Sequence, residues 1–137
     1  MVERRKSVRI ECELLSSFRD LDSQEPGRIE NAVVRNISRG GVKIRVDEFI
    51  PIQNRLYVYI PLPAFQTVEA QVAPLWVVEL PDESAYEIGA RFIDIGQEEE
   101  DAIQDFQYQA LLEKMPFSQN IVKDLLKDSA QDTGPDY

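Results

Sequence analysis

The sequence lacks histidine and contains a single cysteine, Cys12. A chain without an imidazole has no usual partner to activate a nucleophile, and a lone cysteine excludes an internal disulfide. Cys12 falls in an alternating apolar run, so we expect it to be a small buried side chain and not a reactive thiol. Since only scattered carboxylates remain, we expect neither an enzyme nor a metal site.

Long apolar runs and excess positive charge are also missing. No run approaches the length of a membrane span, and the N-terminus is charged where a signal peptide would turn apolar. We therefore expect a cytoplasmic protein without membrane insertion. The net charge of −10 disfavours DNA, RNA and anionic membranes as partners.

The charge is unevenly distributed along the 137 residues. The first ten residues carry four cationic side chains and one carboxylate, whereas residues 94–137 carry eleven acidic side chains and three lysines. A basic head on an acidic body indicates a local anion site and not a broad surface for polyanions.

Six segments are typical of β-strands, because they alternate apolar and polar residues or are rich in strand formers. They are residues 8–14, 29–37, 42–46, 56–60, 67–80 and 86–93. Pro74 predicts a bulge or an edge position within the fifth segment. Short turns without intervening helices favour an antiparallel barrel or sandwich.

A helical period begins only at Gln97 and continues to Lys114. Acidic residues crowd its first turn, where the helix dipole favours negative charge. We expect its apolar side chains, at Ile103, Phe106, Ala110 and Leu111, to cover an open mouth of the barrel. This predicts a domain over residues 1–115, followed over residues 116–137 by a short helix and an acidic tail that we expect to be disordered.

Two short patterns carry functional chemistry. Arg5 and Arg9 stand four residues apart at the entrance to the first strand, and a guanidinium can clamp a phosphate or the O6/N7 edge of guanine with two hydrogen bonds. Asn36-x-Ser38-x-x-Gly41 lies between the second and third strands. This second pattern is also consistent with a turn whose Asn and Ser side chains hydrogen-bond the local backbone.

Together, in this order, the two patterns resemble the signature of PilZ domains, which are bacterial receptors for cyclic di-GMP. The segments 73–78 and 86–92 resemble late strands of that family, and the resemblance covers about residues 3–113. It implies a mainly β fold: a six-stranded antiparallel β-barrel with a C-terminal α-helix.

The resemblance also implies roles for individual residues. Arg5 and Arg9 would bind guanine edges and phosphates, and Arg4 would take a further phosphate. Asn36 and Ser38 would contact the other guanine. The family has Asp or Asn at the position of Asn36. Because an amide lacks the charge of the carboxylate, ligand binding should be weaker by about 1 kcal/mol than with Asp, but it should survive.

Three more residues complete the implied site. Gly41, with Gly40 beside it, would leave room for close approach of the ligand. Trp76 stands where some members place an aromatic side chain against a base, although a core or rim tryptophan explains it equally well.

Our leading hypothesis is a cyclic di-GMP receptor without further cofactor, whose basic arm becomes ordered around the ligand and signals to an unidentified protein partner. The alternative is a PilZ-like protein–protein adaptor that binds no nucleotide. A barrel for single-stranded nucleic acid is disfavoured, because that function needs a basic groove.

Overall fold

The computed structural model describes residues 10–113, which form six strands and one α-helix. The elements are β1 (Ile10–Asp20), β2 (Glu30–Ile37), β3 (Gly41–Val46), β4 (Leu56–Pro61), β5 (Thr67–Leu80), the 3-10 helix η2 (Pro81–Glu83), β6 (Ala85–Asp94) and α1 (Gln97–Glu113). The predicted basic arm, the second short helix and the acidic tail lie outside the described residues. By its internal contacts the chain divides into two units, Met1–Gln107 and Tyr108–Tyr137.

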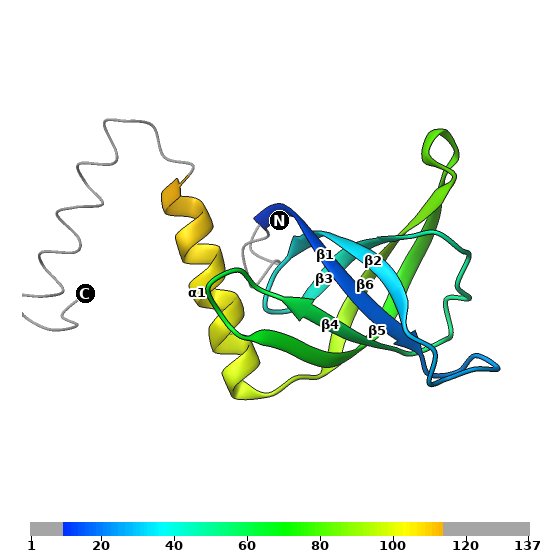
Figure 1. The fold of residues 1–137 in the computed structure, drawn as a ribbon, viewed down its shortest axis with the longest axis horizontal. Coiled ribbons are helices and arrows are strands. Elements are labelled where there is room, and N and C mark those ends of the chain that lie inside the picture. The colour runs from blue at the N-terminus through cyan, green and yellow to red at the C-terminus, as the bar shows by residue number, and fades with distance from the viewer. Residues whose placement is uncertain (1–9, 114–137) are drawn as a thin grey trace, which may run out of the picture. The chain divides into compact units, whose positions relative to one another are not determined.

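The strands close into an antiparallel barrel in the order β1-β2-β3-β6-β5-β4 (Figure 1). This confirms the predicted fold class and selects the barrel over the sandwich. Closure comes from β1, which is long enough to pair with β2 along its length and with β4 at its C-terminal end. A closed barrel leaves inward positions for the core and outward positions for other contacts.

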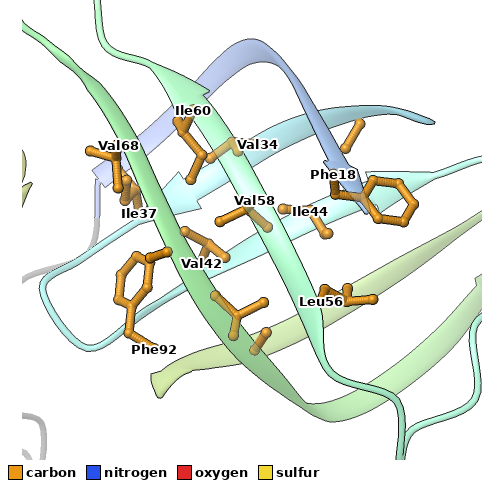
Figure 2. Close-up of a cluster of buried hydrophobic side chains, with 14 of the residues drawn as sticks. Phe18, Val34, Ile37, Val42, Ile44, Leu56, Val58, Ile60, Val68 and Phe92 are labelled. Carbon is orange, nitrogen blue, oxygen red and sulfur yellow. The ribbon is translucent and has the colours of Figure 1, made fainter. Parts of the chain in front are cut away.

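The core is filled by aliphatic side chains from β2 to β6, joined by Phe18 of β1 and Phe92 of β6 (Figure 2). Val34, Ile37, Leu56, Ile60, Val68 and Ile88 are completely buried. Each such side chain contributes roughly 1.5–3 kcal/mol relative to an exposed position. Ala102 and Ile103 of α1 belong to the same cluster and Phe106 packs against it, which confirms the predicted inward positions of Ile103 and Phe106. The prediction for Leu111 is wrong, because this side chain is 43% exposed.

Two predicted strand positions need correction. The first strand does not end near residue 14 but continues to Asp20, because Phe18 returns to the core and is 2% exposed. In the second strand Ile29 lies outside β2 and is exposed, and Val33 faces outward opposite Arg45. The inward residues are Ala32, Val34 and Ile37, because a bulge at residue 35 changes the alternation.

Two other predictions, the bulge at Pro74 and the packing of Cys12 against the core, agree with the structure. A bulge follows Pro74, as that proline predicted, and leaves Leu75 as the extra residue between Pro74 and Trp76. Cys12 is half-buried against the core, and its thiol donates to the carbonyl oxygen of Val34 at 3.7 Å. No helix within residues 10–113 is long and apolar enough to cross a membrane.

The groups with displaced pKa values lie on loops and on β4. Arg55 hydrogen-bonds Asp22 and lowers the pKa of that carboxyl from 3.8 to about 2, while Asp22 in turn raises the pKa of Arg55. The Arg55 Nη2 to Asp22 Oδ1 distance is 2.9 Å. Burial, followed by the nearby Glu69 carboxylate, raises the pKa of Tyr57. None of these three groups is a residue of the predicted ligand site.

Candidate ligand site on the outer face of the barrel

Ser38 closes the turn between β2 and β3. Its hydroxyl oxygen accepts hydrogen bonds from the backbone N–H groups of Gly40 and Gly41, at 3.1 and 3.3 Å. Its own N–H donates to the carbonyl of Gly41 at 2.9 Å, and the residue is only 3% exposed. The structure thus shows Ser38 in the local, turn-closing arrangement that its sequence pattern allowed.

The two glycines hold this turn against β6. Gly40 accepts a hydrogen bond from the N–H of Phe92 at 2.9 Å. A Cβ atom on Gly41 would overlap the carbonyl oxygen of Ala90 and would stand 3.0 Å from the Cα of Arg91. Glycine is therefore needed at position 41 for the close approach of β3 and β6, whatever the ligand requires.

Asn36 is placed on the outer face by the strand register. It pairs with Glu11 of β1 and with Lys43 of β3, and Lys43 points outward because Val42 and Ile44 are both buried. Asn36 is nevertheless only 5% exposed. The side-chain amide of Asn36, which contains one acceptor and two donors, therefore lies at the outer wall of the barrel.

A continuous cross-strand row leads from Asn36 to Trp76. Asn36 pairs with Lys43, Lys43 pairs with Gly89 of β6, and Gly89 pairs with Trp76 of β5. Neighbouring strands lie about 4.8 Å apart, so the three steps span roughly 14 Å. The structure thereby brings the motif turn and the tryptophan to one band of the outer face.

Trp76 lies over the backbone of Gly89. A Cβ at Gly89 would stand 2.5 Å from Nε1 of the indole, so the ring occupies the space that a side chain would need. Trp76 is 39% exposed, which makes it a surface tryptophan and excludes a place in the core. An exposed aromatic ring beside an amide can stack on a planar base.

The sequence reasoning did not select three cationic residues near this band: Arg39, Lys43 and Arg91. Among the basic side chains within residues 10–113, Arg39 and Arg91 make neither an ion pair nor a hydrogen bond with another described residue. Arg39 lies in the turn and Arg91 pairs with Gly41, and both are exposed. The strand alternation of 42–46 could have placed Lys43 outward, but the position of Arg91 beside Gly41 required the β3–β6 register.

Helix α1 contacts the same strand end from within the first unit. The side-chain amide of Gln107, which is 7% exposed, donates to the carbonyl of Ile37 at 3.2 Å. Ile37 stands between Asn36 and Ser38 in the motif. The backbone of the candidate site is therefore hydrogen-bonded directly to the helix.

Of the predicted site residues, the structure brings together Asn36, Ser38, Gly40, Gly41 and, through the register, Trp76. Arg4, Arg5 and Arg9 lie outside the described residues, so their predicted roles remain predictions. Within residues 10–113, every buried side-chain nitrogen or oxygen has a hydrogen-bond partner.

Comparison with known proteins decides the family. The PilZ domain family matches residues 3–109. The chain belongs to the PilZ family. Members of this family are receptor and adaptor domains, and the match includes both sequence patterns. No protein of curated function matches the chain.

Solved structures share the fold of this PilZ domain at low sequence identity. Bacillus subtilis MotI/DgrA, an inhibitor of motility, has 17% identity and a TM-score of 0.68, with 82% of this chain and 54% of that chain covered. The PilZ domain of Escherichia coli YcgR with c-di-GMP has 11% identity and a TM-score of 0.63, with 88% and 98% covered. K. pneumonia MrkH in complex with c-di-GMP has 19% identity and a TM-score of 0.61, with 80% and 53% covered. The chain thus spans about half the length of the MotI and MrkH chains.

Proposed function

We propose that this PilZ domain is a receptor for cyclic di-GMP that acts by binding and not by catalysis. The observation that supports this most is the band from Asn36 to Trp76 beside two exposed cations, Arg39 in the turn and Arg91 of β6 opposite Gly41, which make no ion pair with another described residue. It combines amide donors and acceptors, an aromatic surface and positive charge, which suit the bases and phosphates of a dinucleotide. YcgR and MrkH, which share the fold, are both described with this nucleotide.

Arg5 and Arg9 complete the proposed site as clamps on guanine and phosphate. Guanidinium groups hold both kinds of acceptor with two parallel hydrogen bonds. Asn36 would take a guanine edge, and Trp76 would lie against a base. Arg4 is the proposed further phosphate contact.

Calorimetric titration with cyclic di-GMP tests this function. We expect micromolar or tighter binding by the wild type and loss of binding in Arg5→Ala/Arg9→Ala. The matched control is Arg28→Ala/Arg55→Ala, which removes two charges from side chains that are about half-exposed, at 58% and 53%. Equal affinity of the two double variants would contradict the clamp, and absence of wild-type binding would favour the adaptor that binds no nucleotide.

We further propose that ligand binding is relayed to a protein partner through the arm and α1. The Gln107–Ile37 hydrogen bond supports this route, because a ligand that moves the backbone at Ile37 also acts on the Gln107 side chain of the helix. Hydrogen exchange with and without cyclic di-GMP tests the relay. We expect slower exchange in residues 1–9 and altered exchange in α1, whereas unchanged exchange in both would refute it.

A further inference from the structure

Lys43 stands at the centre of the outer-face band. It lies in the middle of β3, with Asn36 on one side and Gly89 on the other. Because Trp76 covers Gly89, the lysine is flanked by the amide and by the indole. Its side chain is 27% exposed and so remains accessible from solvent.

The ion pair made by Lys43 is weak. Its Nζ lies 4.0 Å from Oε2 of Glu87, at the limit of an ion pair, and both side chains are partly exposed. Such pairs contribute little to stability. An ammonium with three donors and a flexible stem can exchange this carboxylate for another anion at low cost.

Arg45 provides an internal comparison on the same strand and the same face. Its Nε donates to Oε1 of Glu83 at 2.8 Å, its Nη2 donates to the Glu83 carbonyl, and its Nη1 lies 3.6 Å from Asp47. Lys43 and Arg45 thus differ: among the described residues, Arg45 has several close partners, whereas Lys43 has one long contact.

On the receptor function proposed above, we propose that Lys43 is a phosphate-binding residue of the cyclic di-GMP site and that Glu87 restrains it in the unliganded protein. When the dianionic ligand lies along the band, the ammonium exchanges the Glu87 carboxylate for a phosphate oxygen. Glu87 then opposes binding, since it competes for the lysine and repels the phosphate. The two residues should therefore affect affinity in opposite directions.

Titration of cyclic di-GMP into Lys43→Met, Arg45→Met and Glu87→Gln tests this assignment. Loss of one charge-assisted contact on a partly exposed surface should raise the Kd of Lys43→Met about 5- to 20-fold. Glu87→Gln should tighten binding about 2- to 5-fold, and Arg45→Met should stay within about twofold of the wild type. Thermal unfolding of each variant checks that the barrel is intact.

The double variant Lys43→Met/Glu87→Gln separates direct contact from general electrostatics. If Lys43 takes the phosphate, most of the gain from Glu87→Gln should disappear once the lysine is absent. Equal losses in Lys43→Met and Arg45→Met, with wild-type binding intact, would overturn the assignment of Lys43 and leave the receptor function standing. If the wild type binds no cyclic di-GMP, the receptor function fails and this assignment fails with it.

Discussion

The substitution Gly41→Ala probes the contact on which the candidate site is built. The added methyl group would overlap the carbonyl oxygen of Ala90 and approach the Cα of Arg91 to 3.0 Å. Both obstacles are backbone atoms of a paired strand, so no side-chain rotation relieves them. The turn and β6 must separate.

The loss in the free energy of unfolding follows from the steric overlap and from the hydrogen bonds that are weakened when the turn and β6 separate. Overpacking of this kind costs about 1–3 kcal/mol. Two backbone hydrogen bonds hold the turn, Ser38 to Gly41 and Phe92 to Gly40, both 2.9 Å long. Weakening each adds about 1 kcal/mol, and the stiffer unfolded chain of alanine returns up to about 1 kcal/mol. We expect a net loss of about 2–4 kcal/mol in the free energy of unfolding.

Urea unfolding followed by far-UV circular dichroism measures this loss, with Gly27→Ala as the control. A Cβ at Gly27 meets nothing within 4 Å, so the control should change stability by less than about 0.5 kcal/mol. The melting temperature of Gly41→Ala should fall by roughly 10 °C. Equal stability of the two variants would refute the reasoning that glycine is required for the β3–β6 approach.

Three further variants test other contacts. Gly89→Ala should displace the indole of Trp76, which changes the fluorescence of the only tryptophan and weakens cyclic di-GMP binding. Because the ring can move, the free energy of unfolding should fall by less than about 1 kcal/mol. Unchanged tryptophan emission would contradict the contact between Gly89 and the indole. Gln107→Met should leave the Ile37 carbonyl without its amide donor and cost about 1–3 kcal/mol in urea unfolding, and a neutral result would show that this hydrogen bond is dispensable. Asp22→Asn should be less stable than the wild type above pH 4, where the carboxyl of the unfolded chain is ionised. This difference in stability should vanish as the pH falls through about 2, the pKa of Asp22 in the folded protein. A difference that persists below pH 2 would argue against stabilisation by the charged Asp22–Arg55 pair.

Strand alternation was sufficient to predict most of the strands, whereas the choice of a barrel over a sandwich came from the family resemblance. The alternation of Val42, Ile44 and Val46 correctly placed β3, and Pro74 correctly signalled a bulge. The polar residues after Leu14 concealed the second half of β1, because a strand in a closed barrel exposes one face to water and one buried phenylalanine is a weak signal. The predicted second strand began one residue early, because Ile29 is apolar but lies exposed before β2.

The site was only partly predictable, because its residues meet across strands. Asn36, Ser38 and Gly41 share one short pattern and could be found by reading along the chain. Lys43 and Arg91 are ordinary outward residues of their strands, and their relation to Asn36 and Gly41 depends on the β2–β3–β6 register. Sequence periodicity predicts which face a residue occupies but not which residue stands opposite it.

The motif residues divide by what they contact within the protein. Ser38 and Gly41 are committed to the turn and to β6, so their substitution disturbs the backbone that positions every other group. Loss of binding in such variants therefore cannot distinguish a lost ligand contact from a displaced turn. Lys43 and Trp76 stand on the outer face with exposed atoms and few internal partners, and their substitution leaves the turn in place. Affinity measured at these two positions therefore reports directly on what binds the outer face, and it should carry more weight than affinity measured at the glycine or the serine.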